Sequence, residues 1–113
     1  MPKRSYLSEF ELHILLALHR LGDDAYGVAI REEIEERSGR RVWVGPLYTA
    51  LGRLRRDGYL RVTESAPLAV RGGRSRKYYH LSAAGGRALR ESVEMIERMR
   101  RGLSLGTLPG GAR

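Results

Sequence analysis

The amino-acid sequence predicts a mainly helical chain with one small β-hairpin, an α+β fold. Two observations lead to this prediction. Apolar residues recur at helical spacing in three segments of the first half and in one segment near the end. Two short alternating segments, separated by a loop with proline and glycine, precede the last helical segment. A chain of 113 residues is long enough for one domain with a modest core.

The first helix is predicted over about residues 8–21. Ser8 followed by Glu11 has the spacing of a capping box, in which each residue satisfies a backbone N–H of the other. Gly22 ends the helix. Its core-facing stripe is Phe10, Ile14, Leu15, Leu18 and Leu21.

The second helix is predicted over about residues 25–38, with Asp23 and Asp24 as its cap and a glycine after its end. Its acidic outer face makes it a poor candidate for contacting phosphates. Residues 40–44 (RRVWV) are short and β-branched, which predicts a brief strand. The side chains expected to be buried by the second helix are Tyr26, Ala29, Ile30 and Ile34.

The third helix is predicted over about residues 46–57, with Pro46 in its first turn and Gly58 at its end. A helical wheel turns three leucines inward and places small residues and arginines on the opposite face. The inward residues are Leu47, Leu51 and Leu54, and the outward residues are Pro46, Thr49, Gly52, Arg53 and Arg56.

The hairpin is predicted from strands at about 59–65 and 76–82, of which the second should bury one of two adjacent tyrosines, Tyr78 and Tyr79. The loop at about 66–77 joins the strands and forms a basic wing. Three helices followed by such a hairpin make a winged helix-turn-helix, predicted over residues 1–81. The cationic residues of the wing are Arg71, Arg74, Arg76 and Lys77.

A fourth helix is predicted over 82–102, capped by Ser82, and a disordered tail is expected over 103–113. The apolar residues of this helix follow spacings of four, three and three, the pattern of a helix-pairing seam. We expect it to dimerise with a second copy rather than pack within the monomer. The expected dimer residues are Leu7, Phe10, Leu89, Val93, Ile96, Met99 and Leu103.

The net charge of +8 is unevenly distributed. Residues 1–39 hold 5 basic and 8 acidic side chains, a balance of −3. Residues 40–80 hold 10 basic and 2 acidic side chains, a balance of +8, and residues 81–113 hold 6 and 3. A concentrated positive field is typical of a surface that binds a polyanion. Because the major groove admits one α-helix, we expect the third helix to bind double-stranded DNA there.

Four sequence segments resemble the PadR family of bacterial transcriptional regulators: AYG at 25–27, GPLYTALGRLRRDGYL at 45–60, GGRSRKYYHLS at 72–82 and AAG at 83–85. The resemblance spans roughly residues 8–90. It implies a winged-helix homodimer that represses transcription from a palindromic operator, often in response to a small-molecule effector. The short C-terminal part is similar to the subtype with a single C-terminal helix. The matching motifs add Tyr26, Gly45 and Tyr48 to the expected DNA contacts.

One motif departs from the family pattern. Many members carry GTLYPAL where this chain has GPLYTAL, so Pro46 and Thr49 alter the outward face of the third helix. This change affects the operator sequence rather than the mode of binding. Trp43 directly precedes that helix; we expect a core or half-buried packing residue, and the alternative is an aromatic wall for a ligand.

Two other function classes are disfavoured. An enzyme would need a nucleophile or a cluster of ligating residues, but cysteine is absent and His13, His19 and His80 have no such neighbours in the sequence. We therefore expect no catalytic residues, no metal and no cofactor. A basic RNA-binding or ribosome-associated module is the alternative, but such modules usually stack bases on a wider sheet. No apolar run is long enough to span a bilayer, so we expect a cytoplasmic protein with no membrane contact.

Overall fold

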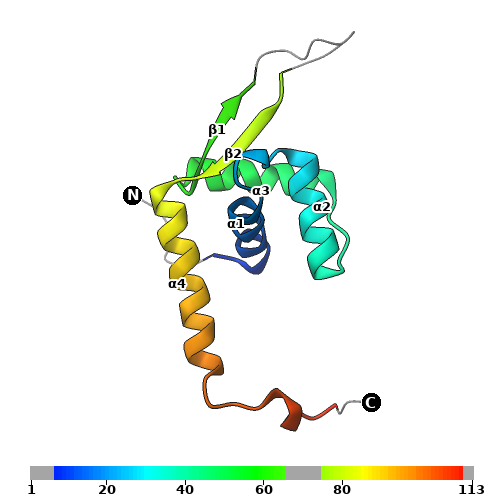
Figure 1. The fold of residues 1–113 in the computed structure, drawn as a ribbon, viewed down its shortest axis with the longest axis vertical. Helices are drawn as coiled ribbons and strands as arrows, with labels where there is room; N and C mark the ends of the chain where they lie inside the picture. The colour runs from blue at the N-terminus through cyan, green and yellow to red at the C-terminus, as the bar shows by residue number, and fades with distance from the viewer. Residues whose placement is uncertain (1–6, 66–74, 111–113) are drawn as a thin grey trace.

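The computed structural model describes residues 7–65 and 75–110. Helix α1 (Glu9–Leu21) is followed by the short 3₁₀ turn η1 (Gly22–Asp24), then α2 (Gly27–Ser38) and α3 (Val44–Arg56). Strands β1 (Leu60–Glu64) and β2 (Lys77–Leu81) form the hairpin, and α4 (Ala83–Arg100) and the 3₁₀ turn η2 (Leu105–Thr107) complete the chain. The predicted winged helix-turn-helix is confirmed. The hairpin projects from the three-helix body, and α4 begins at the base of the hairpin and runs in the opposite direction (Figure 1).

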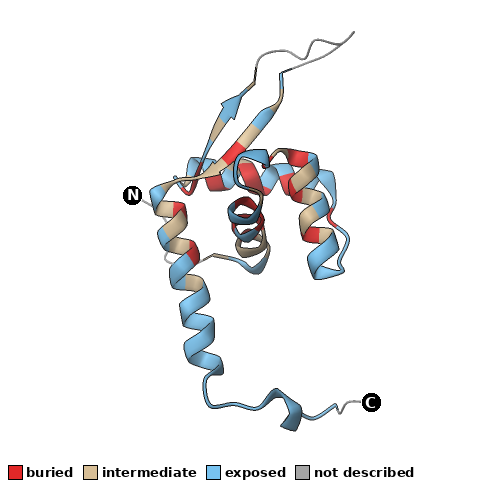
Figure 2. Ribbon diagram, in the orientation of Figure 1, coloured by how far each residue is buried: buried red, intermediate tan, exposed pale blue. Residues whose placement is uncertain are grey.

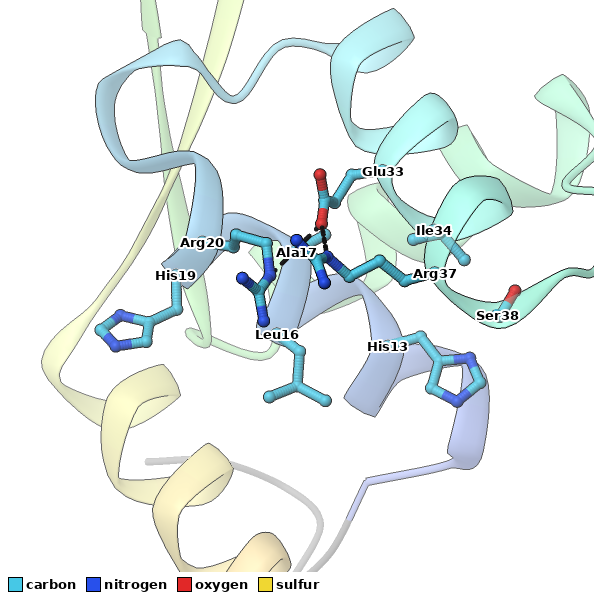
Figure 3. A pocket seen from close by; sticks show the side chains of 9 residues that line it. All are labelled: His13, Leu16, Ala17, His19, Arg20, Glu33, Ile34, Arg37 and Ser38. Atoms are coloured by element: carbon cyan, nitrogen blue, oxygen red, sulfur yellow. Dashed lines mark hydrogen bonds and ion pairs between the residues drawn. The ribbon is translucent and has the colours of Figure 1, made fainter.

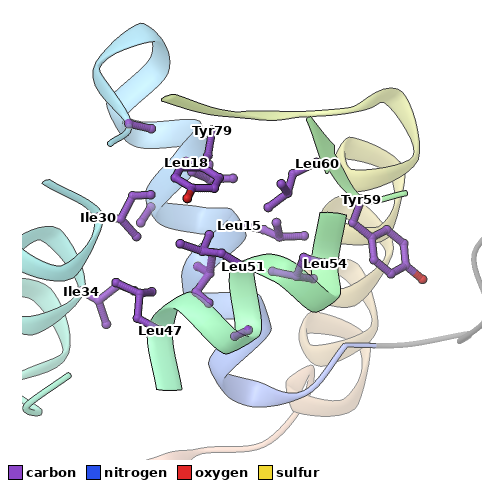
Figure 4. Close-up of a cluster of buried hydrophobic side chains, with 14 of the residues drawn as sticks. Leu15, Leu18, Ile30, Ile34, Leu47, Leu51, Leu54, Tyr59, Leu60 and Tyr79 are labelled. Atoms are coloured by element: carbon purple, nitrogen blue, oxygen red, sulfur yellow. The ribbon is translucent and has the colours of Figure 1, made fainter. Parts of the chain in front are cut away.

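The core lies between α1, α2 and α3, and the hairpin closes one end of it. The inward stripe predicted for α3 is fully buried, against Ile14 and Leu15 of α1 and Ile30 of α2. Figure 4 shows Leu15, Ile30 and the three leucines of α3 converging with the buried ring of Tyr79 from β2. Burial of this many aliphatic side chains is the main stabilising contribution, at about 1.5–3 kcal/mol for each. It fixes the orientation of α3 and therefore its outer face.

The capping box predicted for α1 is present. Ser8 N–H donates to Glu11 Oε1 at 2.9 Å, and Glu11 N–H donates to Ser8 Oγ at 3.2 Å. The predicted cap of α2 is wrong. Asp23 and Asp24 lie in η1, and Tyr26 occupies the N-cap position without a side-chain hydrogen bond. The two aspartates end the preceding turn, so they are too early in the chain to reach the first N–H groups of α2.

The predicted strand at residues 40–44 is also wrong. Residues 40–43 have no regular structure, and Val44 already belongs to α3. The physical reason is the hydrogen bond of Val42, whose N–H donates to Glu35 Oε2 of α2 at 2.8 Å instead of to a neighbouring strand. Val42 itself is buried, so its side chain anchors a tight connection between two helices.

The two strands pair antiparallel with Leu60 opposite Leu81 and Val62 opposite Tyr79. Tyr79 is buried and Tyr78 is half-buried on the other face, as the alternation predicted. Burial raises the pKa of the Tyr79 hydroxyl above its ordinary value, with a further increase from Tyr48 that Arg55 partly offsets. The base of the hairpin is joined to the helical body, because Tyr79 N–H donates to the carbonyl of Ala25 at 2.8 Å.

Helix α4 is fixed at its beginning and exposed along the rest of its length. Ser82 caps it by accepting the N–H of Gly85 at 3.0 Å and donates to the carbonyl of Gly58 at 2.6 Å. Gly85 packs so closely on the backbone of Tyr59 that a Cβ there would lie 1.9 Å from the carbonyl oxygen. Leu89 is 8% exposed, whereas the second half of the helix is almost entirely exposed (Figure 2). The domain boundaries and the disorder of residues 103–113 stay predictions.

Candidate nucleic-acid interface

The outer face of α3 is exposed in the way the helical wheel predicted. Gly45, Pro46, Thr49 and Arg56 are exposed, and Gly52 is partly covered. Gly45, Thr49 and Gly52 have small side chains, so they leave the backbone of α3 accessible along one side. A helix with a narrow outer face can approach the base edges of a major groove closely, and Arg56 provides a positive charge at its C-terminal end.

Arg53 has a structural contact that the sequence did not reveal. Its Nε lies 4.0 Å from Oε2 of Glu11, whose side chain is 3% exposed. Glu11 therefore combines a capping hydrogen bond to Ser8 with an ion pair to α3. The guanidinium of Arg53 is half exposed, so it contributes to the packing of α1 on α3 as well as to the positive surface.

A groove of about 420 Å³ lies between the start of α2, α3 and the hairpin, beside the outer face of α3. Arg76 and Lys77 of the hairpin and Tyr48 of α3 line it, together with the first residues of α2. Glu64, the acidic residue in the lining, accepts a hydrogen bond from Ser75. The groove brings together four predicted DNA-binding residues from three parts of the sequence, namely Tyr26, Tyr48, Arg76 and Lys77.

Tyr26 stands at the centre of a small cluster beside this groove. Its ring and the ring of Tyr78 meet edge to face, with centroids 5.9 Å apart and planes at 77°. The guanidinium carbon of Arg76 lies 4.1 Å from the centroid of the Tyr26 ring. Tyr26 is half-buried rather than buried, in contrast to the prediction, because its ring covers the hairpin instead of entering the core.

Gly27 makes room for Tyr48. A Cβ on Gly27 would lie 1.8 Å from the Tyr48 hydroxyl oxygen, so the tyrosine can occupy this place only against a glycine. The AYG segment thus has a physical explanation in two parts. Tyr26 contacts the hairpin, and the absence of a side chain on Gly27 leaves space for Tyr48 of α3. Arg71 and Arg74, the other predicted wing residues, lie outside the described residues.

Trp43 differs from the prediction. It is 63% exposed at the N-cap of α3, and the guanidinium carbon of Arg41 lies 5.2 Å from its ring centroid. Val42 fills the core position in this connection, which turns the next side chain outward. Neither of the two described grooves has Trp43 in its lining, so the ligand-wall interpretation stays a prediction.

A second groove, of about 580 Å³, lies between α1 and α2 on another face (Figure 3). Glu33 lies between two arginines there, 3.3 Å from Nε of Arg20 and 2.5 Å from Nε of Arg37. Leu16 is exposed beside them and points away from the Glu33 carboxylate in Figure 3. The sequence did not predict an exposed Leu16, which directly follows two core residues of α1.

The predicted dimer residues fall into two groups. Val93, Ile96, Met99 and Leu103 are exposed, as a surface awaiting a partner requires. Leu89 belongs to the subunit's own core, and Leu7 and Phe10 pack against that core, because the first half of α4 and the start of α1 cover the hydrophobic cluster themselves. The assignment of all seven residues to a dimer interface stays a prediction.

Within residues 7–65 and 75–110, no three His, Asp or Glu side chains are grouped in a way that could hold a metal ion. No helix in the same ranges is long and apolar enough to cross a membrane. The features that do stand out are three core helices, a two-stranded wing and an exposed, arginine-bearing third helix. They define a winged helix-turn-helix protein of the class that regulates transcription by binding DNA.

The chain belongs to the PadR-like family of transcriptional regulators, whose family model matches residues 14–91. It is similar to the transcriptional regulator Rv3488 of Mycobacterium tuberculosis H37Rv, with 38% identity over 90 residues that cover 80% of this chain and 78% of that protein. Both the family and this relative are transcriptional regulators.

Solved structures of the family have the same fold. A PadR-like transcription factor from Bacteroides fragilis superimposes with a TM-score of 0.69 at 28% identity, covering 80% of this chain and 82% of that chain. A PadR family regulator from Clostridium difficile R20291 gives a TM-score of 0.68 at 27% identity, covering 81% and 90%. The resemblance seen in the sequence motifs is thereby confirmed.

Proposed function

We propose that this regulator is a repressor that binds a palindromic operator as a homodimer, with α3 in the major groove and the wing against the DNA backbone. The observation that supports this most is the position of Arg76 and Lys77. They line a groove next to the exposed face of α3, so one duplex can contact both elements. Backbone contacts from the wing would position the protein, and side chains of α3 would read the bases.

The expected base-reading residues lie near the start of α3, the end that enters the groove first in helix-turn-helix proteins. Pro46 and Thr49 are exposed there, and Tyr48 is exposed on the side of the groove. The proline ring and the threonine methyl favour apolar contact with thymine methyl groups, and the threonine hydroxyl adds one hydrogen bond. Arg53 and Arg56, further along, would reach phosphates or guanine edges.

The homodimer is proposed from the exposed apolar face of α4. Met99 is 72% exposed, and Val93, Ile96 and Leu103 are also exposed. Leu16 on α1 is a further exposed apolar side chain. A single recognition helix reads only a few base pairs, whereas a two-fold dimer places two such helices about one turn of DNA apart. A dimer bound across a promoter would block its use, which is the physical basis of repression.

The test is a titration of labelled DNA from immediately upstream of the protein's own gene, followed by fluorescence anisotropy at several salt concentrations. We expect the logarithm of the binding constant to fall linearly with the logarithm of salt concentration, with a slope of about −0.9 per phosphate contact. A duplex of scrambled sequence should bind more weakly with a comparable slope. Equal binding to both duplexes would contradict sequence-specific recognition.

Two variants that each lose one positive charge serve as a matched pair in this titration. Arg56→Ala removes a charge from the outer face of α3 and should weaken binding and reduce the slope. Arg20→Ala removes a charge from the α1–α2 groove, where Arg20 pairs with Glu33, and should leave both quantities near those of the unmodified protein. Repression itself is tested by in vitro transcription from the same promoter, which should decline as protein is added. Transcription that rises instead would identify an activator.

A further inference from the structure

The wing arginine Arg76 is held in place at both its backbone and its side chain. Its N–H donates to Ser65 Oγ at 2.9 Å, and its carbonyl accepts the N–H of Ser65 at 2.9 Å. This pair of hydrogen bonds continues the hairpin beyond the last paired residues, Glu64 and Lys77. At the other end of the side chain, the guanidinium lies over the face of the Tyr26 ring, 4.1 Å from its centroid.

Tyr26, whose ring lies under the guanidinium of Arg76, is itself held in place by backbone hydrogen bonds. Its carbonyl accepts the N–H of Ile30, which starts the hydrogen-bond ladder of α2, and its own N–H donates to Asp24 at 3.1 Å. Tyr26 also forms an isolated antiparallel bridge with Tyr78, whose ring meets it edge to face. Tyr26 is therefore fixed by α2 on one side and by the hairpin on the other.

Stacking has a specific consequence for an arginine. The guanidinium is planar and its N–H groups lie in that plane, so a ring that covers one face leaves the N–H edge available. An arginine that is already ordered loses less freedom when it binds an anion than one that moves freely in solvent. Arg76 lines the same groove as Lys77 and the start of α2, where two positive groups face one space.

We infer that Tyr26 is a positioning residue for DNA binding. The Tyr26 hydroxyl makes no contact with DNA in this assignment. The Tyr26 ring instead holds the guanidinium of Arg76 in the orientation in which the guanidinium binds a backbone phosphate. The inference rests on the proposed DNA-binding function and refines it, because it separates Tyr26 from the residues that touch DNA directly.

The test compares Tyr26→Phe, which keeps the ring, with Tyr26→Leu, which removes it. In the anisotropy titration we expect Tyr26→Phe to bind like the unmodified protein and Tyr26→Leu to lose about three- to tenfold in affinity, the range of a cation–π contact. The salt slope is the decisive readout. Tyr26→Leu removes no charge, yet its slope should become less steep by about 0.9, as if one phosphate contact were lost.

Arg76→Ala completes a double-mutant cycle. It should show the same loss and the same change of slope, and the variant with both Tyr26→Leu and Arg76→Ala should bind no worse than Arg76→Ala alone. Val28→Ala, a truncation in the same groove, is the control and should retain the full slope. The affinities are compared below the unfolding transition of each variant, so that a loss of stability does not count as a loss of binding.

A measurement without DNA checks the stack directly. The ring current of Tyr26 should shift the Nε–H resonance of Arg76 upfield in the unmodified protein and in Tyr26→Phe, but not in Tyr26→Leu. A shift that persists in Tyr26→Leu would overturn the inference. So would Tyr26→Phe binding as weakly as Tyr26→Leu, because the hydroxyl would then be the active group, or additive losses in the cycle. If the unmodified protein shows no salt-dependent DNA binding, the proposed function fails instead.

Discussion

Replacing Arg53 by alanine tests whether an arginine of the expected recognition helix also holds the fold together. The guanidinium lies 4.0 Å from the Glu11 carboxylate, and Glu11 is 2% exposed at the beginning of α1. Arg53→Ala removes a cationic neighbour from that buried carboxylate. Because α1 is docked on α3 at this point, we expect the variant to be less stable as well as weaker in DNA binding.

The magnitude lies between two limits. Removing one member of a fully buried pair costs about 3–5 kcal/mol, whereas an exposed pair contributes about 0–1 kcal/mol. The Arg53 side chain is 47% exposed and the separation is long for an ion pair, so solvent screens much of the attraction. We expect a loss of about 1–2 kcal/mol. For a domain of this size that corresponds to a fall in Tm of roughly 4–8 °C.

The assay is urea and thermal unfolding followed by circular dichroism, with two controls. Arg56→Ala removes the same charge from the exposed face of α3 and should leave Tm within about 2 °C of the unmodified protein, the range of an ordinary surface substitution. Glu11→Gln keeps an oxygen for the capping hydrogen bond but removes the negative charge. In that background Arg53→Ala should cost close to nothing. An unchanged Tm in Arg53→Ala alone would refute the structural role and leave Arg53 as a DNA contact only.

Three further predictions concern the core, the fourth helix and the dimer. Leu51→Ala should lower the free energy of unfolding by about 2–5 kcal/mol, measured by urea denaturation, because a fully buried side chain leaves a cavity; a loss below about 1 kcal/mol would contradict its core position. Gly85→Ala should destabilise strongly because its Cβ would meet a backbone oxygen at 1.9 Å, whereas Gly86→Ala, with open space around it, should be neutral or stabilising; similar melting curves for both would show that the contact is not close. Val93→Asp combined with Ile96→Asp should yield a monomer by light scattering, and a persistent dimer would place the interface elsewhere.

The helices could be predicted from local signals that tertiary structure does not override. The leucines of α3 recur every three or four residues, and the Ser8–Glu11 pair acts within one helical turn, so both depend only on nearby residues. The segment at 40–44 illustrates the opposite case. Its β-branched residues favour a strand, but a strand needs a partner along its edge, and here the Glu35 side chain takes the hydrogen bond of Val42.

The candidate site was predictable in composition but not in arrangement. Exposure of Arg56 and Thr49 follows from helical geometry, which the sequence contains. The contacts of Arg53 with Glu11 and of Arg76 with Tyr26 join residues 42 and 50 positions apart in the chain, and no periodicity within a helix or strand encodes such a distance. The exposure of Trp43 was missed for a related reason: a large aromatic side chain is usually buried, and only the packing of Val42 shows that the core position next to it is already filled.

Helix α4 is attached to the rest of the protein at its beginning, where Ser82 bonds to Gly58 and Gly85 packs on Tyr59. A small tilt at this joint is therefore amplified at the far end of the helix. An α-helix of 18 residues is about 27 Å long, and its first turn is attached to the turn that directly follows α3. In a dimer joined through the far half of α4, a tilt of roughly 10° at the joint would move the far end by about 5 Å. That displacement exceeds the rise of one DNA base pair, about 3.4 Å. A small rotation about one glycine contact would therefore be enough to take the two recognition helices out of register with the half-sites of an operator.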